Sequence, residues 1–354
     1  VKTLSTKDIK ELGAQIILSN TYHNLLRPGM GIMKKTGGLH NFMNWQGPIL
    51  TDSGGFQVYS LSKIRKITDK GVIFQSHIDG QKYELTPKKV LQIQKTIGSD
   101  IAMVLDECVG YPATRREVEK AVERTTCWAG ESKKAMKQCN NETMVFSINQ
   151  GGIYKDLRLK SARELTSINF DGYAIGGLAV GEPWQKAIKV LDWVVPELPE
   201  NKPRYLMGVG YPEQIIQAVK KGIDMFDCVI PTREGRHGKL FLWKKSHQNK
   251  STKNYLPLTK ARLAEGLPRR RENKRGGKEF YDTIQITNAK FTRNFSPINK
   301  NSKFPELREY SLAYLRHLFK TGEPLAHRLA TLNNLEFYLT LMSKIRENIN
   351  KGVL

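Results

Sequence analysis

Short apolar segments alternate with longer amphipathic segments from residue 1 to residue 238. Most of the longer segments have the length of helices. The apolar segments are rich in β-branched residues and have the length of strands; they are Ile16–Ser19, Pro48–Thr51, Ile101–Leu105, Met144–Ile148, Tyr173–Ile175, Tyr205–Val209 and Met225–Ile230. This alternation predicts parallel strands connected by crossover helices.

Three of the longer segments carry apolar residues at helical spacing and open with Thr or Pro, which favour a helix start: Thr114–Met136, Pro183–Val195 and Pro212–Lys221. No Gly-x-Gly-x-x-Gly motif follows the first strand, which argues against a dinucleotide-binding sheet. The pattern therefore predicts an α/β fold of the (β/α)8 TIM-barrel type. A complete barrel has eight strands, and seven are recognisable here.

Polar residues follow the predicted strands at their C-terminal ends, where the active sites of such barrels lie. Asp52, Asp106, Gln150 and Asp227 each follow a different strand. A single Asp after a strand is usually a helix cap or a turn residue. Three on separate strands are better explained as a site, and paired carboxylates suit glycosyl chemistry. Asp and Gln also offer the acceptors and donors that a purine edge requires.

The chain of 354 residues carries 57 Lys and Arg against 34 Asp and Glu, a formal net charge of +23. Such a charge favours a polyanionic partner, nucleic acid before membrane, and a generally lysine-rich proteome is the alternative. From Lys244 to Lys278, seven Lys and five Arg stand against two Glu. This segment has little apolar periodicity, so we expect an insertion or a mobile arm.

The sequence contains no apolar run long enough for a membrane span, and its first residues lack the apolar core of a signal peptide. Its four cysteines form no Cys-x-x-Cys motif, which argues against a disulfide framework and a Cys-rich zinc site. We therefore expect a reduced, cytoplasmic protein without a membrane partner.

Five long motifs coincide with the predicted strand ends: Asp52-Ser-Gly-Gly-Phe-Gln-Val58, Asp106-Glu-Cys108, Gly176-Gly-Leu-Ala-Val-Gly-Glu182, Tyr205-Leu-Met-Gly-Val-Gly210 and Asp224-Met-Phe-Asp-Cys-Val-Ile-Pro-Thr-Arg233. With these motifs the chain resembles the bacterial tRNA-guanine transglycosylases (queuine tRNA-ribosyltransferases), from Val1 to about Trp243 and again from about Ile284 onward. The resemblance implies a (β/α)8 barrel and a glycosyltransferase of the pentosyltransferase class. Such enzymes exchange the wobble guanine (position 34) of GUN-anticodon tRNAs, those for aspartate, asparagine, histidine and tyrosine, for a 7-deazaguanine in queuosine biosynthesis.

The resemblance assigns the chemistry to two carboxylates. Asp227 matches the family nucleophile, which attacks C1′ of the wobble nucleotide, expels guanine and leaves a ribosyl-aspartate ester. Asp52 matches the general acid/base, which protonates the departing guanine and deprotonates the incoming base.

Further matched positions belong to the base pocket. Asp106 and Gln150 match residues that hydrogen-bond the amide and amino edges of the purine. Gly177 and Leu178 match residues that contribute backbone groups to the same base. The resemblance therefore implies a pocket that binds guanine and the incoming base in turn.

Four side chains complete this pocket by resemblance. Phe56 and Met207 match the residues that stack on the two sides of the base. Cys108 and Val180 match the bacterial pocket type, which suits the compact aminomethyl base preQ1, with preQ0 and queuine as the alternatives. For Met207 and Val180, core packing is the plainer interpretation.

The resemblance also extends to tRNA binding. Arg233 and Arg236 match residues that hold the anticodon nucleotides beside the wobble base, and phosphate contact is the plainer alternative. The basic segment is longer than the usual family connection, so Arg269, Arg270 and Arg271 are expected to contact phosphates.

The bacterial enzymes work as homodimers through an aromatic cluster on a C-terminal helix. Tyr310, Tyr314 and His317 have the spacing that places them on one helix face. We therefore expect a homodimer, with packing of this face inside the chain as the alternative.

The structural zinc site of the family is the main departure. Ser302, Phe304, Leu307 and Asn333 occupy the positions of its three cysteines and its histidine, so no soft tetrahedral donor set remains. We expect no zinc and no other cofactor, with Phe304 and Leu307 filling the space as a small apolar core.

A second departure is that Val1 begins inside the family pattern, so the first barrel strand is expected to be missing from this chain. The predicted segments are residues 1–243 for the barrel and its active site, 244–283 for the basic insertion or mobile arm, and 284–354 for a mostly helical C-terminal subdomain with the remnant of the zinc site and a closing helix. A non-catalytic tRNA-binding paralogue, a defunct fragment, an archaeal-type enzyme and a DNA-modifying relative remain alternatives. Retention of Asp52, Asp106, Gln150 and Asp227 favours an active enzyme.

Overall fold

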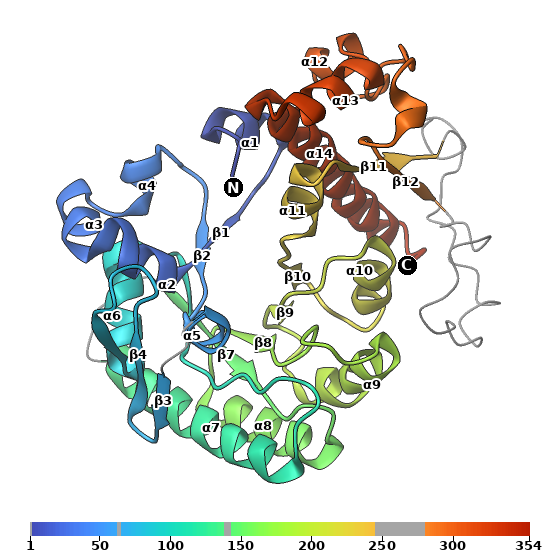
Figure 1. Cartoon of the computed structure of the whole chain (residues 1–354). Coiled ribbons are helices and arrows are strands. Elements are labelled where there is room, and N and C mark those ends of the chain that lie inside the picture. Colours follow the sequence, from blue (N-terminus) through green and yellow to red (C-terminus); the bar gives the residue numbers. More distant parts are fainter. Residues whose placement is uncertain (1, 62–64, 138–142, 245–279) are drawn as a thin grey trace. The chain divides into compact units, whose positions relative to one another are not determined.

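The computed structural model describes residues 2–61, 65–137, 143–244 and 280–354. By their packing these residues form two compact units (Figure 1). The barrel unit is Gln15–Cys228, and the C-terminal unit combines Val1–Ala14 with Val229–Leu354.

The barrel unit is built on a parallel sheet that has seven strands among the described residues, in the order β1-β2-β6-β7-β8-β9-β10. The strands are β1 (Ile17–Ser19), β2 (Ile49–Thr51), β6 (Ile101–Met103), β7 (Met144–Asn149), β8 (Gly172–Ile175), β9 (Arg204–Leu206) and β10 (Met225–Phe226). Because their order follows the chain and every pairing is parallel, the predicted (β/α)8 type of fold is confirmed.

Crossover helices connect the strands and lie along the outer side of the curved sheet (Figure 1). They are α6 (Pro87–Ile97), α7 (Arg115–Lys137), α8 (Lys155–Ile168), α9 (Trp184–Val194, followed by the 3-10 turn Val195–Glu197) and α10 (Pro212–Val219). The three helices predicted from the sequence correspond to α7, α9 and α10. Helix α7 begins with the predicted Thr114 cap, because Glu117 N–H donates to Thr114 Oγ1 (3.3 Å) and Thr114 N–H to Glu117 Oε2 (2.8 Å).

Shorter elements surround the first two strands. They are α2 (Thr21–Asn24), the π-helical turn Leu25–Gly29, α3 (Met30–Thr36), α4 (Leu39–Met43) and α5 (Gly55–Leu61). In the described residues, no helix combines the length and the apolar character that a membrane span requires.

A small antiparallel sheet was not predicted from the sequence. It consists of β3 (Arg65–Thr68), β4 (Gly71–Gln75) and β5 (Lys82–Leu85). Gly71 has φ +148°, and a Cβ atom there would lie 2.1 Å from the carbonyl oxygen of Leu85, so only glycine fits this close strand approach. The Phe74 and Tyr83 rings stack at 5.6 Å across the β4–β5 pair.

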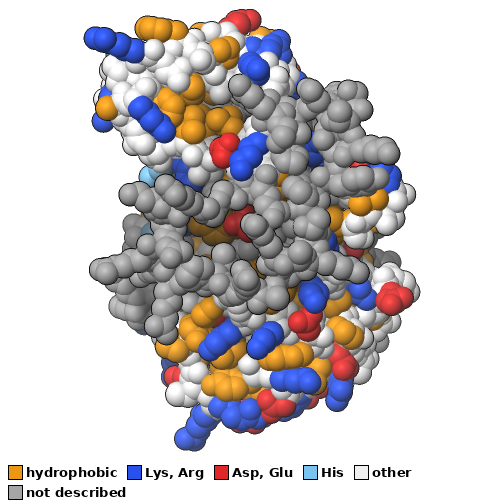
Figure 2. Space-filling model, turned by 90° about the vertical axis from the view of Figure 1, so that its right-hand side faces the viewer, with side chains coloured by type: hydrophobic (Ala, Val, Ile, Leu, Met, Phe, Trp, Pro, Cys, Tyr) orange, Lys and Arg blue, Asp and Glu red, His pale blue; other side chains and the backbone are white. Residues whose placement is uncertain are grey.

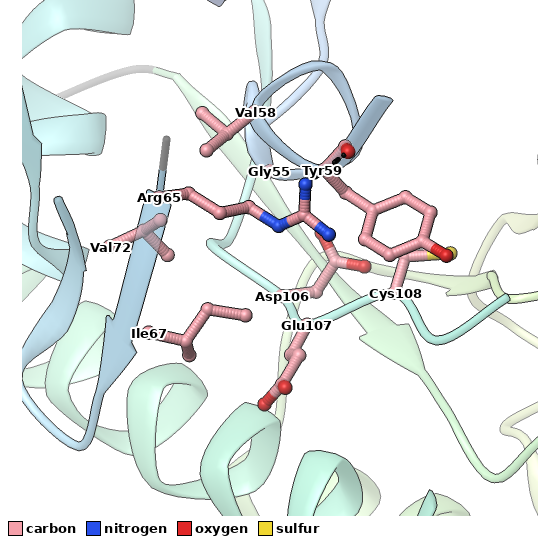
Figure 3. A pocket seen from close by; sticks show the side chains of 9 residues that line it. All are labelled: Gly55, Val58, Tyr59, Arg65, Ile67, Val72, Asp106, Glu107 and Cys108. Carbon is pink, nitrogen blue, oxygen red and sulfur yellow. Dashed lines mark hydrogen bonds between the residues drawn. The ribbon is translucent and has the colours of Figure 1, made fainter. Parts of the chain in front are cut away.

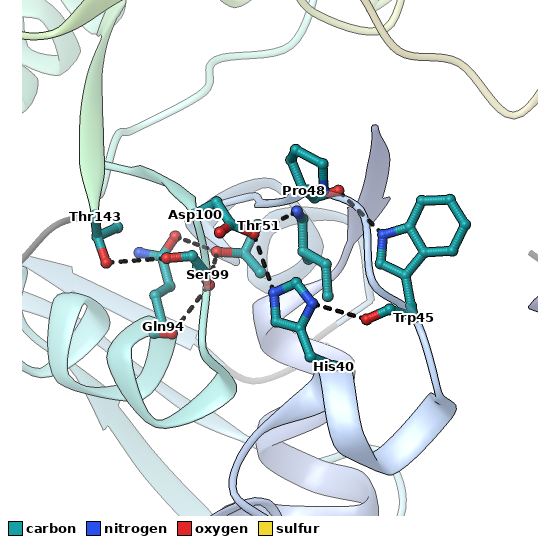
Figure 4. Close-up of polar contacts among 9 residues, drawn as sticks. His40, Trp45, Pro48, Thr51, Gln94, Ser99, Asp100 and Thr143 are labelled. Atoms are coloured by element: carbon teal, nitrogen blue, oxygen red, sulfur yellow. Dashed lines mark hydrogen bonds and ion pairs between the residues drawn. The ribbon is translucent and has the colours of Figure 1, made fainter. Parts of the chain in front are cut away.

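The N-terminal ends of β2 and β6 are joined by a polar network (Figure 4). The Asp100 carboxylate accepts the backbone N–H of Ile49 (2.7 Å) and contacts Nε2 of His40 (3.1 Å). His40 Nδ1 lies 3.0 Å from the carbonyl oxygen of Trp45. These contacts fix the alignment of the two strands at the end opposite to the predicted site, where polar residues serve stability.

The last predicted strand, Met225–Ile230, is wrong after Phe226. Strand β10 ends at Phe226, and Ile230 begins helix α11 (Ile230–Arg236). Pro231 in the first turn of α11 favours this helix start. Asp227 therefore lies immediately after the strand instead of inside it.

The C-terminal unit is mostly helical, as the sequence predicts for its last part. It contains α1 (Thr6–Leu12), α11, the antiparallel pair β11 (Lys239–Trp243) and β12 (Tyr281–Gln285), the 3-10 turn Ala289–Phe291, α12 (Pro305–Glu309), α13 (Leu312–Thr321) and α14 (Pro324–Asn350). Asn334 of α14 accepts the N–H of Phe241 and donates to the carbonyl oxygen of Lys239, which ties β11 to this helix. The predicted insertion, 244–283, falls between β11 and β12 and includes the first residues of β12. Its residues 245–279 lie outside the described residues.

Candidate active site

Four polar side chains stand directly after strands of the barrel unit, at the C-terminal end of the sheet. Asp52 follows β2, Gln150 follows β7 and Asp227 follows β10, while Asp106 lies three residues beyond β6. Asp52, Asp106 and Gln150 are buried, and Asp227 is half-buried. The structure thus places the four predicted side chains at one end of one sheet, as parallel strand polarity requires.

The Asp52 carboxylate accepts three hydrogen bonds. Its Oδ1 accepts the backbone N–H groups of Thr21 and Gly54, both at 3.1 Å, and its Oδ2 accepts the Asn20 side-chain amide. Burial nevertheless raises the pKa of Asp52 from 3.8 to about 7, and the negative charges of Asp227 and Asp106 add to this rise. A carboxyl group with such a pKa can both give and take a proton near neutral pH.

Asp106 and Gln150 form a buried hydrogen-bonded pair. Gln150 Nε2 donates to Asp106 Oδ2 (2.8 Å), and Ser53 Oγ donates to Asp106 Oδ1 (2.9 Å). Burial raises the pKa of Asp106, while these two hydrogen bonds lower it. The pair combines a carboxyl and an amide group, which together can match donors and acceptors on one edge of a planar base.

Asp227 is oriented through one of its two oxygens. Its Oδ1 accepts the Tyr205 hydroxyl (2.6 Å) and the backbone N–H of Gly208 (2.9 Å). Among the described residues, no hydrogen bond is donated to Oδ2 of this carboxylate. Burial raises the pKa of Tyr205 well above 10, and the charge of Asp227 adds to this, so the phenol stays a donor.

The glycine-rich loop after β8 closely contacts Gln150. A Cβ atom at Gly177 would lie 2.3 Å from Gln150 Oε1, and its φ of +62° also favours glycine. A Cβ at Gly176 would lie 3.0 Å from Gln150 Nε2 and 3.6 Å from Met207 Sδ. Backbone groups of this loop, which continues into Leu178, therefore lie next to the Asp106–Gln150 pair.

The remaining predicted pocket residues differ in their environment. The Leu178 side chain is buried in the apolar core of the unit, which leaves its backbone for binding, and half-buried Met207 packs against the same core. Phe56 on α5 is 44% exposed, with its ring centroid 6.4 Å from that of Tyr59. Burial raises the pKa of the Cys108 thiol to about 12, so it is neutral and packs as a small apolar group.

A small pocket adjoins Asp106 on the side of α5 and the β3–β4 pair (Figure 3). It is lined by Gly55, Val58, Tyr59, Arg65, Ile67, Val72, Asp106, Glu107 and Cys108. The guanidinium of Arg65 lies 4.7 Å from the centre of the Tyr59 ring and donates to the Tyr59 carbonyl oxygen (2.9 Å). A second pocket, between the loops after β6, β7 and β8, is lined by Val180 together with Gly177, Tyr111 and Glu182.

Comparison with known proteins agrees with this geometry. A family model described as queuine tRNA-ribosyltransferase matches residues 1–354. The chain belongs to the queuine tRNA-ribosyltransferase family. A queuine tRNA-ribosyltransferase of Clostridium perfringens is 48% identical over 356 residues, which cover 99% of this chain and 84% of that protein. One of Clostridium botulinum is 47% identical over 354 residues, which cover 98% and 84%. The predicted family is confirmed, and the chain is an enzyme of the glycosyltransferase type.

The arginines predicted to bind tRNA lie outside the barrel unit of this ribosyltransferase. Arg233 and Arg236 belong to α11, where Arg233 is exposed and Arg236 half-buried. Arg269, Arg270 and Arg271 lie outside the described residues. On the face shown in Figure 2, Lys and Arg side chains are interspersed with acidic and apolar ones.

The four positions of the family zinc site do not fit zinc in this ribosyltransferase. Ser302 Oγ donates to Glu336 Oε2 (2.5 Å), and Asn333 Nδ2 donates to the carbonyl oxygen of Phe241 (3.0 Å). Phe304 and Leu307 are buried in an apolar cluster. Across the described ranges, no group of three or more His, Cys, Asp or Glu side chains is placed to hold a metal ion.

Sequence reasoning missed three residues that shape this site: Asn20, Tyr205 and Arg158. The first two bond directly to the reacting carboxylates predicted from the family. Arg158 is fully buried in the first half of α8. One signal in the sequence could have identified it: it shares the inward helix face with Ser161, Ala162 and Leu165, where an arginine is unusual.

Proposed function

We propose that this enzyme exchanges guanine at position 34 of GUN-anticodon tRNAs for preQ1 through a covalent ribosyl intermediate on Asp227. At the family level, its activity is that of a tRNA-guanine transglycosylase. The single observation that carries the finer proposal is the placement of Asp52, Asp106, Gln150 and Asp227 at the C-terminal ends of strands of one parallel sheet, with Asp106 and Gln150 hydrogen-bonded to each other. It supplies a nucleophile, a proton carrier and a purine-binding pair.

The proposed reaction has two half-reactions that mirror each other. Asp227 Oδ2 attacks C1′ of the wobble nucleotide; the bond between C1′ and guanine N9 breaks, and Asp52 gives its proton to the departing base. The incoming base then loses a proton to Asp52 and attacks C1′, which breaks the ester and frees Asp227. Oδ2 is favoured as the attacking atom because Oδ1 already accepts two hydrogen bonds.

Base recognition is assigned to the pair and the loop beside it. Asp106 and Gln150 bind the amide and amino edges of the purine, and Gly177 with Leu178 contributes backbone groups. Phe56 and Met207 stack on the base. The absence of a side chain at Gly176 and Gly177 keeps the space beside Gln150 open for the base.

Cys108 and Val180 are assigned to the same preQ1 pocket. The neutral, buried thiol of Cys108 adds no charge there. Val180 lines the neighbouring pocket beyond Gly177, where a substituent of the base has room to extend.

tRNA binding is assigned to cationic residues outside the barrel unit. Arg233 and Arg236 contact nucleotides next to the wobble base, and Arg269, Arg270 and Arg271 contact phosphates. The expected helix face is wrong for Tyr310, which lies before α13, whereas Tyr314 and His317 lie on that helix. A homodimer through the surface of Tyr310 and Tyr314 would let a second copy support the tRNA. Both side chains are more than one-third exposed, with ring centroids 5.2 Å apart.

We also propose that the enzyme holds no zinc and works in the cytoplasm. The side chains at the former ligand positions are engaged in hydrogen bonds and apolar packing, which supports folding of this region without metal. The replacement of the zinc ligands also favours one alternative function, that of a tRNA-binding paralogue without catalysis. Such a paralogue has no need of a coupled pair of reacting carboxylates, which is why we place it second.

Exchange of labelled guanine into GUN-anticodon tRNA tests the proposal. Asp227→Ala should abolish exchange and leave tRNA affinity within a few-fold, because the nucleophilic carboxylate is lost while the residues assigned to tRNA binding are unchanged. The matched control is Asp192→Ala, which removes a surface carboxylate paired with Lys221. Turnover by Asp227→Ala would exclude this nucleophile. Absence of exchange by the unmodified chain, with tRNA binding intact, would favour the paralogue.

A further inference from the structure

Arg158 is a buried cation at the centre of the barrel unit. Its guanidinium donates to the carbonyl oxygens of Asn149 and Gly152, both at 2.9 Å, and to Oδ1 of Asn149 at 3.0 Å. A longer hydrogen bond of 3.4 Å reaches the carbonyl oxygen of Gly177. All these hydrogen-bond acceptors are neutral, and the charge of nearby Glu182 acts on the guanidinium without a hydrogen bond to it. The hydrogen bonds of Arg158 therefore hold backbone segments together.

These acceptors belong to the two loops that carry the base-binding groups. Asn149, the last residue of β7, and Gly152 lie on either side of Gln150, and Gly177 lies in the loop after β8. The connection is reciprocal, because Asn149 Nδ2 donates back to the Arg158 carbonyl oxygen (3.0 Å). At Gly151, a Cβ atom would lie 2.8 Å from the Arg158 backbone nitrogen, so the loop and α8 are in direct contact.

The bond to Gly177 also sets the direction of the next peptide group. The C=O of Gly177 and the N–H of Leu178 belong to one trans peptide plane and point in opposite directions. With the carbonyl turned towards Arg158, the Leu178 N–H points away from the guanidinium. Arg158 thereby holds the backbone on both sides of Gln150 and the Gly177–Leu178 peptide.

The cost of burying this side chain indicates a role beyond packing. Transfer of a cation into the interior is unfavourable, and apolar side chains of similar volume usually serve a core at least as well. Burial lowers the pKa of Arg158 to about 10, so it remains charged at neutral pH. The guanidinium group of arginine is charged and carries five N–H groups in a fixed fork, so it can hydrogen-bond to two loops at once. An apolar side chain and the ammonium group of lysine lack this geometry.

We propose that Arg158 is a positioning residue that sets the geometry of base recognition by joining the Gln150 loop to the Gly177–Leu178 peptide. This inference rests on the proposed purine-binding role of these groups. It predicts that loss of the guanidinium weakens binding of the free base and leaves binding of tRNA unchanged, because α8 is not among the elements assigned to tRNA.

The test measures KM for guanine and KM for tRNA separately in Arg158→Lys. The guanine KM should rise about tenfold or more, while the tRNA KM stays within about threefold. Arg163→Lys is the matched control: it lies on the same helix, on the surface, where it pairs with Glu197, and both KM values should equal those of the unmodified enzyme.

A milder variant covers the case in which Arg158→Lys does not fold. Asn149→Ala leaves the arginine in place but removes one of its acceptors, and it should raise the guanine KM by about threefold without changing the tRNA KM. A guanine KM that stays unchanged in either folded variant would overturn the inference. So would equal proportional changes in both KM values. Absence of exchange by the unmodified enzyme would instead contradict the proposed function.

Discussion

The raised pKa of Asp52 has a measurable consequence for folding. Burial is the main cause, and the charges of Asp227 and Asp106 contribute to it, so the group titrates near 7 in the folded protein instead of at 3.8. Between these two values the folded protein keeps the Asp52 proton while the unfolded chain has released it. The folded state therefore binds more protons, and the free energy of unfolding must fall as the pH rises through this window.

The magnitude follows from the two pKa values. The difference between 3.8 and about 7 corresponds to about 4 kcal/mol of unfolding free energy, which is present at low pH and lost by about pH 8. The steepest slope that one group can give is about 1.4 kcal/mol per pH unit. Groups with lowered pKa values, such as Asp8 and Asp156, act in the opposite direction, so only a comparison between variants isolates Asp52.

Asp52→Asn is the informative perturbation, because an amide does not titrate. The variant keeps an oxygen for the N–H groups of Thr21 and Gly54, but its new amide group meets the donor side chain of Asn20. That mismatch costs about 1–3 kcal/mol. We therefore expect Asp52→Asn to be about 1–3 kcal/mol more stable than the unmodified enzyme near pH 8 and less stable near pH 4.

Urea unfolding of both proteins at several values between about pH 4 and pH 8 measures this difference. The same variant should show no guanine exchange at any pH, since an amide cannot take up and return a proton. Asp192→Asn is the control, because its carboxylate is a surface ion-pair partner and its removal should leave the pH profile parallel to that of the unmodified enzyme. Parallel profiles for Asp52→Asn as well would refute the reasoning.

Four further predictions address the pocket, the metal, the basic segment and the assembly. Gly177→Ala should raise the guanine KM by about tenfold or more, since its Cβ atom would lie 2.3 Å from Gln150 Oε1; an unchanged KM in steady-state kinetics would contradict this. Elemental analysis of untagged protein should give far less than one zinc per chain, and stoichiometric zinc whose chelation unfolds the protein would show the opposite. Neutralising Arg269–Arg271 should flatten the slope of log K for tRNA against log salt by up to about 3, whereas an equal slope would remove these residues from the interface. Light scattering should give twice the chain mass, and Tyr314→Ala should shift it towards that of one chain; a monomer with full activity at every concentration would disprove the dimer.

The sequence predicts the carboxylates proposed to react better than it predicts the residues that hydrogen-bond to them. Asp52 and Asp227 can be located because runs of β-branched residues mark the strands. Parallel strands run in the same direction, so their C-terminal ends lie at the same edge of the sheet. No local sequence pattern predicts the roles of Asn20 and Tyr205, because these roles depend on partners far along the chain. Asn20 bonds to Asp52, 32 positions away, and Tyr205 bonds to Asp227, 22 positions away. The end of β10 was misplaced because apolar residues continue beyond Phe226, where Pro231 favours a helix instead.

In the proposed mechanism, two carboxylates of the same type have different tasks because their surroundings differ. Asp52 lies in a buried environment that makes its proton exchangeable near neutral pH, which suits a group that must protonate one base and deprotonate another. Asp227 is held through Oδ1 by a phenol that stays protonated and by a backbone N–H, which orients Oδ2 for attack. The negative charge of Asp227 in turn contributes to the raised pKa of Asp52. The proposed nucleophile therefore helps the proposed acid to keep its proton before the substrate reacts, and removal of the Asp227 charge should lower the pKa of Asp52.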